Sequence, residues 1–249
     1  MRRRALSLAL VAALAAAAGC GGGSGPPALK VSAAASLKPA LTRYAGEGGA
    51  RAAFSFAGSD ELAAQIRAGG RPDVFAAANS RLPEELFAAG RLERPVPFAT
   101  NRLVLAVPAA SEIATVAGAG RPGVAVAVGA PRVPVGAYTR EVLARLGPAT
   151  ARAILANVRS EEPDAGSIVA KLTQGGVEAG FVYVTDVRAS AGRLRAVAIP
   201  ARFQPTVVYA AAVVRGSAHP AQARAFVGGL LEGAGAAALR AAGFGPPPR

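Results

Sequence analysis

The feature that most constrains the fold is the alternation of short apolar runs with amphipathic helical patterns from residue 29 onward. The runs that predict strands are residues 29–34, 52–56, 73–77, 103–107, 124–128, 180–184 and 206–214. The helical patterns are residues 37–44, 61–68, 83–89, 137–146, 165–173, 219–231 and 236–242. Alternation of this kind predicts an α/β fold with mostly parallel sheets flanked by helices.

The N-terminus predicts export. Arg2, Arg3 and Arg4 precede an apolar stretch over 6–18, which is shorter than the about 20 residues that a membrane-spanning helix needs. Cys20 follows directly, so the segment resembles a bacterial lipoprotein signal. We predict a signal peptide over 1–19, lipid attachment at Cys20 and a flexible linker over 20–28, in a protein that acts in the cell envelope or periplasm. The alternative is a free Cys20 after an ordinary signal peptide.

The composition excludes several kinds of site. The chain has one Cys, one His and no Trp, so it cannot build a disulfide framework or a Cys/His zinc site. A Ser-His-Asp or Cys-His catalytic arrangement is not expected either. We therefore predict a protein that is not an enzyme and that needs no cofactor.

The charge balance points to an anionic partner. There are 28 basic and 15 acidic residues, for a formal net charge of +13, and nearly all the basic residues are Arg. A nucleic acid, an anionic membrane surface or a small anion would fit this balance. The basic residues are scattered without interleaved aromatics, so we expect no nucleic-acid binding. A base-composition bias of the genome is the alternative explanation.

The junctions between predicted strands and helices are small or neutral at their tips. They are residues 33–36, 57–60, 134–137, 164–167 and 182–184. Open α/β sheets bind ligands at such junctions, and the first N–H groups of a helix bind anions because they lack intrahelical partners. None of these segments holds a Lys or Arg. The pattern predicts a site that holds an anion by neutral hydrogen-bond donors alone.

Seven segments carry a family resemblance. They are VSAAASLKPAL (31–41), FSFAGSDELAAQI (54–66), RPDVFAAA (71–78), NRLVLAVP (101–108), VAVGAPRVPVGAYTREVLARLG (124–147), EAGFVYVTDVRAS (178–190) and AGFG (242–245). In this order and spacing, the chain resembles the periplasmic molybdate-binding proteins of ABC transporters over nearly all of residues 29–244.

The resemblance implies a two-lobed periplasmic-binding-protein fold with the ligand in the cleft between the lobes. The chain would cross between the lobes near 103–108 and again near 206–209. Lobe 1 would comprise residues 29–105 plus 208–249, and lobe 2 would comprise residues 106–207.

The resemblance also implies the oxyanion ligands: the hydroxyls of Ser36, Ser59 and Tyr183, and the main-chain N–H groups of Val135 and Ala165. Each has a simpler alternative. The two serines can be helix N-caps, the Val135 segment a helix-entry turn, and the tyrosine a half-buried strand aromatic. Asp60 departs from a neutral site, because a carboxylate repels an oxyanion unless it turns away.

The expected function is capture of molybdate, and of tungstate, for delivery to an ABC permease. The protein would act as a monomer, with no direct protein ligand to the metal. The same fold binding sulfate or phosphate is the main alternative. Two remoter alternatives are an envelope enzyme using Tyr183 and Asp186 for acid–base chemistry, and a polyanion-binding surface protein, whose binding would weaken steeply with salt.

Overall fold

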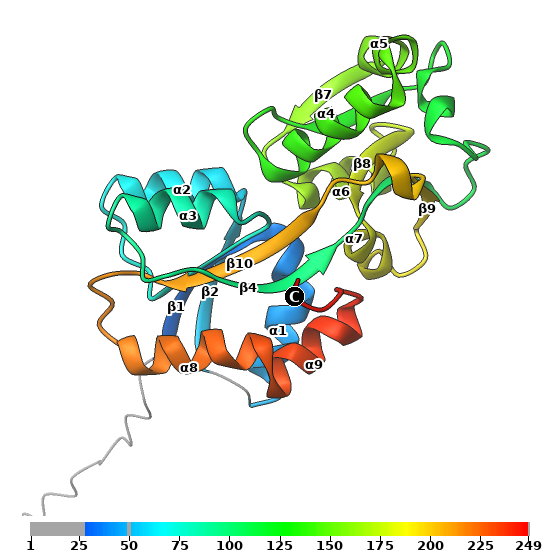
Figure 1. Ribbon diagram of the computed structural model, residues 1–249. Helices are drawn as coiled ribbons and strands as arrows, with labels where there is room; N and C mark the ends of the chain where they lie inside the picture. Colours follow the sequence, from blue (N-terminus) through cyan, green and yellow to red (C-terminus); the bar gives the residue numbers. More distant parts are fainter. Residues whose placement is uncertain (1–27, 49–50, 249) are drawn as a thin grey trace, which may run out of the picture.

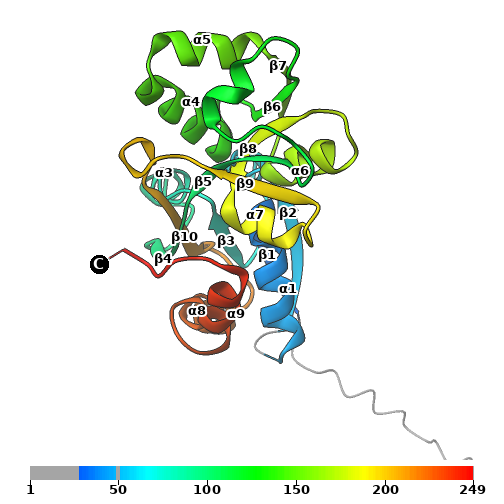
Figure 2. The same ribbon diagram turned by 90° about the vertical axis from the view of Figure 1, so that its right-hand side faces the viewer.

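The structure is a computed structural model that describes residues 28–48 and 51–248. The predicted signal peptide, Cys20 and the predicted linker up to residue 27 lie outside the described residues. Within them the chain forms two five-stranded sheets. Each sheet lies in its own lobe and carries its own helices (Figures 1 and 2). The predicted two-lobed α/β fold is confirmed.

The first sheet has the strand order β2-β1-β3-β10-β4. Its strands are β1 (Leu29–Ala34), β2 (Ala52–Ala57), β3 (Val74–Ala77), β4 (Val96–Asn101) and β10 (Val207–Val213). One face is covered by α2 (Ser59–Arg67) and α3 (Arg81–Ala88), and the other by α1 (Lys38–Gly46), α8 (Pro220–Leu231) and α9 (Gly233–Ala242) (Figure 1). The central strand β3 is fully buried along its whole length, as a continuous apolar run predicts.

The second sheet has the order β7-β6-β8-β5-β9. Its strands are β5 (Leu103–Pro108), β6 (Val126–Gly129), β7 (Val158–Glu162), β8 (Ala179–Tyr183) and β9 (Leu194–Ala198). Its helices are α4 (Pro134–Leu146), α5 (Pro148–Ala156), α6 (Ala165–Thr173) and α7 (Val184–Ala189). Three short 3-10 helices complete the described elements: η1 (Ala35–Leu37), η2 (Val116–Gly120) and η3 (Ala201–Phe203).

Both sheets are mixed, so the expectation of mostly parallel sheets holds only for part of each. Strand β1 pairs in parallel with β2 and β3, and β6 pairs in parallel with β7 and β8. Strand β10 is antiparallel to β3 and β4, and β5 is antiparallel to β8 and β9. In each sheet one strand runs against the others: β10 lies between β3 and β4, and β5 lies between β8 and β9. Each is the strand by which the chain enters that sheet from the other lobe, without a helical crossover.

The chain changes sheet at Arg102. Asn101 pairs with Val207 in the first sheet, whereas Leu103 already pairs with Tyr183 in the second. This point falls a few residues before the predicted lobe boundary at 105, because the whole of β5 belongs to the second sheet. The chain returns between β9 and β10. We propose lobes bounded by these two changes of sheet.

The sequence pattern did not predict β4, β7, β9, α5 or α7, and three of these show why. Strand β4 holds Pro97 and lies at a sheet edge, where a missing N–H is tolerated. Strand β7 is a polar edge strand with the sequence VRSEE. Helix α5 starts at Pro148 directly after α4 ends, because proline at a first helical position starts a new helix as well as stopping the old one.

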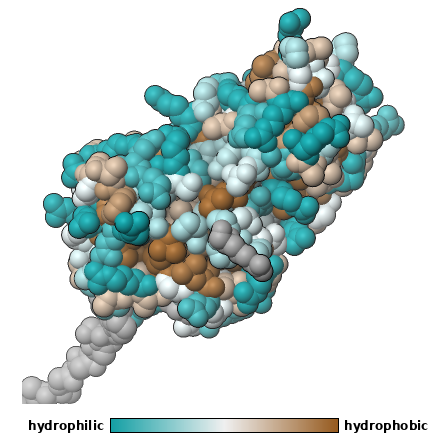
Figure 3. Space-filling model, viewed as in Figure 1, coloured by the Kyte–Doolittle hydropathy of each residue, from teal (hydrophilic) through white to brown (hydrophobic). Residues whose placement is uncertain are grey.

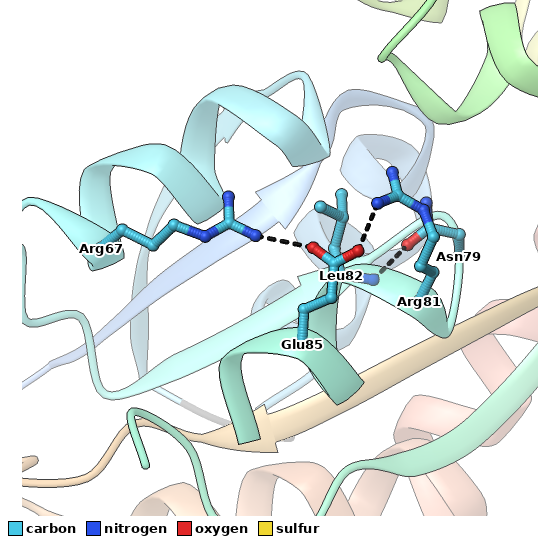
Figure 4. Close-up of polar contacts among 5 residues, drawn as sticks. All are labelled: Arg67, Asn79, Arg81, Leu82 and Glu85. Atoms are coloured by element: carbon cyan, nitrogen blue, oxygen red, sulfur yellow. Dashed lines mark hydrogen bonds and ion pairs between the residues drawn. The ribbon is translucent and has the colours of Figure 1, made fainter. Parts of the chain in front are cut away.

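Local polar contacts order the segment after β3. The Asn79 carboxamide oxygen accepts the Leu82 N–H at 3.1 Å and so caps the first turn of α3. Farther along α3, Glu85 accepts bonds from Arg67 of α2 at 2.8 Å and from Arg81 at 2.5 Å (Figure 4). Exposed pairs of this kind contribute only about 0–1 kcal/mol each. They therefore order the helix surface rather than stabilise the lobe.

The face in Figure 3 is largely hydrophilic over the outer helices, with apolar patches near the middle of the lower lobe. Across residues 28–48 and 51–248, no helix has the length and apolar character needed to cross a membrane.

Candidate functional site

All five residues predicted to bind the oxyanion line one small cavity of about 10 Å³ between the lobes. Its lining comprises Ala34, Ala35, Ser36, Ala57, Gly58, Ser59 and Ala78 from lobe 1, and Val133, Pro134, Val135, Asp164, Ala165 and Tyr183 from lobe 2. A volume of this order holds about one water molecule. The two lobes therefore meet closely around the point where the five predicted residues converge.

Ser36 lies in η1, directly after β1, and is 4% exposed. Its Oγ is 2.8 Å from the Oη of Tyr209, which comes from β10. The start of η1 has no side-chain cap, so the alternative that Ser36 is a helix N-cap is not what the structure shows. The Ser36 hydroxyl instead forms a buried polar contact with a strand of the lobe 1 sheet.

Ser59 is the first residue of α2, after an N-cap at Gly58, and it does not cap the helix with its side chain. Its Oγ accepts the main-chain N–H of Ala78 at 3.1 Å. That bond uses a lone pair and leaves the hydroxyl proton free for another acceptor. Ser59 is 1% exposed, so an acceptor for this proton has to lie within the cavity region.

The lobe 2 side of the cavity is formed by two helix starts. Val135 is the second residue of α4, and Ala165 is the first residue of α6. N–H groups in the first turn have no intrahelical acceptor and carry the positive end of the helix dipole. Gly136 allows α4 to start this close to β6, since a Cβ there would lie 2.1 Å from the Ala130 carbonyl oxygen.

Tyr183 ends β8 and is 1% exposed. Its Oη is buried and has no hydrogen-bond partner within the described residues. Burial raises the pKa of this phenol well above 10, so it keeps its proton at neutral pH. A buried hydroxyl without a partner costs free energy, and one that lines a cavity is positioned to donate to a ligand.

Asp186 orders the strand end that carries Tyr183. Its carboxylate accepts the Tyr183 main-chain N–H at 2.9 Å, which ties the first turn of α7 to the end of β8. Burial raises the pKa of Asp186 to about 7, with a smaller contribution from the charge of Asp164, while the bond from Tyr183 opposes the rise. Asp186 does not line the cavity.

The lobes touch at Gly58. A Cβ built on Gly58 would lie 2.4 Å from the carbonyl oxygen of Pro163, which precedes α6 in lobe 2. The backbone of Gly58 has φ −60° and ψ 137°, which any residue adopts. Glycine is therefore required here by the approach of the opposite lobe and not by the conformation of the chain.

The hydrogen-bond donors that line the cavity are neutral. Its lining contains no Lys or Arg, and the one carboxylate in it, Asp164, is engaged in capping α6 through the Ser167 N–H at 2.8 Å. Asp60 is not part of the lining, although its Oδ1 is buried beside Gly58 and has no partner in the described part of the chain. No group of three or more metal-ligating side chains occurs in the described part of the chain.

Sequence reasoning brought the five residues together but missed what supports them. Tyr209 and Asn101 lie behind Ser36, and Gly58 meets the other lobe, yet none carries a local signal of these roles. Tyr209 sits in an apolar run that predicts an ordinary strand residue. The apolar run predicted only that Tyr209 lies in a strand, and it gave no sign of the hydrogen bond to Ser36.

Two α/β lobes joined by two crossings, with a donor-lined cavity between them, define a binding protein of the periplasmic type. The chain belongs to the family of bacterial extracellular solute-binding proteins, whose family model matches residues 29–245. This is a family of exported binding proteins, which agrees with the predicted export.

Among curated relatives, the chain is 36% identical over 267 residues to the molybdate-binding protein ModA of Mycobacterium tuberculosis (strain ATCC 25618 / H37Rv), covering 99% of this chain and 100% of the relative. The ModA of Mycobacterium bovis matches to the same extent.

Among solved structures, the fold matches the periplasmic molybdate-binding protein of Azotobacter vinelandii with a TM-score of 0.79, at 23% identity over 88% of this chain and 100% of that one. It also matches the sulfate-binding protein SubI of M. tuberculosis H37Rv with a TM-score of 0.76, at 17% identity over 88% and 86%.

Proposed function

We propose that this protein captures molybdate outside the cytoplasm and delivers it to the permease of an ABC transporter, and that it takes tungstate as well. The ligand would lie between the lobes where the cavity is, and the lobes would separate slightly to admit it, since the cavity holds only about one water molecule as it stands. The hydroxyls of Ser36, Ser59 and Tyr183 and the N–H groups of Val135 and Ala165 would bind its oxygens. The identity with the ModA proteins over the full chain supports this choice of ligand.

The observation that carries the proposal is the buried Tyr183 hydroxyl, which has no partner in the described structure and lies among other donors. A set of groups that mostly donate suits an anion that carries no proton. Binding by fixed neutral donors needs no countercharge, because hydrogen bonds to a charged acceptor are stronger than neutral ones. We infer a binding protein with no catalytic group and no bound cofactor.

Phosphate and sulfate are the competing ligands. Phosphate retains a proton at neutral pH, so a site selective for it needs an acceptor for that proton. Asp164 lines the cavity, but its two oxygens already accept bonds from the N–H and Oγ of Ser167. Asp60, whose Oδ1 is buried without a partner among the described residues, is not part of the lining. This arrangement favours a fully deprotonated dianion. Among those dianions, donors spaced for a larger oxyanion cannot all reach the smaller sulfate.

A thermal-shift comparison of molybdate, tungstate, sulfate and phosphate tests the proposal. A ligand at about a hundred times its Kd stabilises the folded protein by about 2.7 kcal/mol. For a chain of this size the melting temperature rises by roughly 2–4 °C per kcal/mol, or about 5–11 °C in total. We expect this shift with molybdate and tungstate and little with equal sulfate or phosphate. A larger shift with phosphate would overturn the molybdate proposal and implicate Asp60.

We further propose that the monomer is held at the membrane by a lipid on Cys20. The support is the sequence alone: an apolar stretch, a lone Cys and a Gly/Pro-rich segment in that order. A labelled fatty acid should enter the wild type and not the Cys20→Ser variant. Equal labelling of the two would rule out this anchor without touching the binding proposal.

A further inference from the structure

A buried chain of hydrogen bonds runs behind the cavity. Asn101, at the end of β4, donates through Nδ2 to the Oη of Tyr209 at 3.4 Å, and this Oη lies 2.8 Å from the Oγ of Ser36. The same Nδ2 donates to the Oγ1 of Thr185 in lobe 2 at 2.9 Å. Figure 1 shows the end of β4 beside α7, which carries Thr185. All four side chains are buried, with at most 8% exposed.

The direction of this chain follows from which groups can only donate. The Asn101 Oδ1 accepts the Arg102 main-chain N–H at 2.9 Å, which assigns the other end of the carboxamide as the NH2 group. An NH2 group only donates, so the Tyr209 oxygen accepts from it. The single proton of Tyr209 is then available to Ser36; the 2.8 Å contact allows either hydroxyl to donate, and we take the arrangement in which the Ser36 Oγ accepts. This arrangement leaves the Ser36 proton unused by the protein.

We propose that Tyr209 is a positioning residue for oxyanion binding: by donating to the Ser36 Oγ, it directs the Ser36 proton into the cavity. Without that donor, the Ser36 hydroxyl is free to rotate and to donate its hydrogen bond to an acceptor outside the cavity. Tyr209 is fully buried and does not line the cavity, so it acts through Ser36 and not on the ligand. This inference rests on the proposed oxyanion function of the same cavity.

Two adjacent tyrosines, Tyr183 and Tyr209, therefore have different proposed roles: one binds the ligand and the other positions Ser36. The rings of Tyr183 and Tyr209 pack edge to face with centroids 5.8 Å apart. The Tyr183 hydroxyl has no partner among the described residues, whereas the Tyr209 hydroxyl is held on two sides. Burial also raises the pKa of Tyr209 well above 10, so its proton is present throughout the neutral range.

The Tyr209→Phe variant isolates the hydroxyl. It keeps the ring, which packs edge to face on Phe98 and Phe244 with centroids 6.2 and 5.2 Å away. We expect molybdate affinity, measured by calorimetry, to fall by about 3- to 10-fold, the scale of one neutral hydrogen bond. Tyr44→Phe is the matched control. Tyr44 is also a buried tyrosine of lobe 1, packed on Phe226 and away from the cavity, so affinity should not change.

A double-mutant cycle separates positioning from a general structural effect. If Tyr209 acts through Ser36, then Tyr209→Phe has no further effect on affinity in a Ser36→Ala background. A purely structural role predicts the same loss in both backgrounds, and that result overturns the inference. Unchanged affinity in Tyr209→Phe, or in Ser36→Ala, also overturns it.

Binding by the wild type distinguishes a failure of the proposed function from a failure of the inference about Tyr209. A wild type that binds neither molybdate nor tungstate removes the proposed function and this inference with it. A wild type that binds, with a Ser36→Ala loss and no coupling to Tyr209, removes the inference alone.

Discussion

The two lobes contribute to the cavity by different chemistry. Lobe 1 contributes the hydroxyls of Ser36 and Ser59, each held by a hydrogen bond to the interior of its own lobe. Lobe 2 contributes the starts of α4 and α6, where the donors are main-chain N–H groups, and the hydroxyl of Tyr183, which has no partner among residues 28–48 and 51–248.

The difference teaches which substitutions each half tolerates. A hydroxyl is lost with any change to an apolar side chain, so the lobe 1 positions depend on residue identity. A main-chain N–H survives every substitution except proline, so the Val135 and Ala165 positions tolerate different side chains. The predictions below test this contrast, from the largest expected effect to the smallest.

Ala165→Pro should give the largest loss of affinity. It removes the N–H of the first residue of α6, where proline fits the helix without breaking it. The preceding Asp164 is already extended, at φ −162° and ψ 170°, as a residue before proline prefers. We expect a loss of about 3 kcal/mol, the upper end for a bond to a charged group, because the proline ring also enters the cavity.

Ala165→Gly is the control for this change, since it keeps the N–H and should bind nearly as well as wild type. Calorimetric titration with molybdate measures both variants. Full affinity in Ala165→Pro would mean that α6 contributes no donor to the ligand.

Ser36→Ala and Ser59→Ala should each weaken molybdate binding by about 1–3 kcal/mol, the scale of a hydrogen bond to a charged group. Ser59→Ala also leaves the Ala78 N–H without its acceptor, so it should lower the melting temperature of the free protein as well. The same titration and a thermal melt distinguish the two effects. Unchanged affinity in both variants would remove lobe 1 from the proposed site.

Gly58→Ala tests whether the lobes close on the ligand. A Cβ there would meet the Pro163 carbonyl oxygen of lobe 2, and the Asp60 Oδ1 at 2.9 Å, although that flexible side-chain end can turn away. Overpacking costs about 1–3 kcal/mol. We expect this cost in molybdate affinity, because the clash arises when the lobes are together, and little change in the melting temperature of the free protein, whose lobes can separate to relieve it.

Gly228→Ala is the matched control, because a Cβ on Gly228 meets nothing within 4 Å. It lies inside α8, where alanine is the better helix former. Its affinity should equal that of the wild type. Equal affinity in Gly58→Ala would show that binding does not need this contact.

A separate test, of stability and not of affinity, contrasts a buried carboxyl in each lobe. Burial raises the pKa of Asp186 in lobe 2 to about 7, above the unfolded value of about 3.9. Between these values the folded state holds a proton that the unfolded state has lost, so stability falls as pH rises from about 4 to about 7. Asp186→Asn should flatten this fall in urea unfolding measured across the same range.

Asp73 in lobe 1 shifts the other way. Burial opposes its ionisation, but hydrogen bonds from Ser217 and the Lys30 N–H outweigh it and lower the pKa. Its contribution is therefore present above about pH 4 and is lost in acid. Asp73→Asn should reduce the loss of stability below pH 4 and leave the slope between pH 4 and 7 unchanged. The reverse pattern in the two variants would contradict the contrast between the lobes.

Much of the fold was predictable because the signals are local. The run at 29–34 became β1, and the predicted helix at 165–173 became α6 with the same bounds. The missed elements are edge strands, short helices and segments that contain proline, such as β4 and α5. Their local sequences carry a weak apolar pattern, so contacts with the rest of the lobe decide their structure. For the site, the neutral junctions were visible in sequence, and the resemblance selected the donors among them.

The sequence by itself determined where strands end and helices begin, and therefore where main-chain donors are exposed. It also determined that no positive side chain stands at those points. These are local properties, set by propensities and apolar periodicity over a few residues. The tertiary structure decided which junctions face one another. Ser36 meets Tyr209 across 173 positions, and Gly58 meets Pro163 across the cleft. Such contacts depend on where the chain crosses between lobes, and no short-range pattern encodes that.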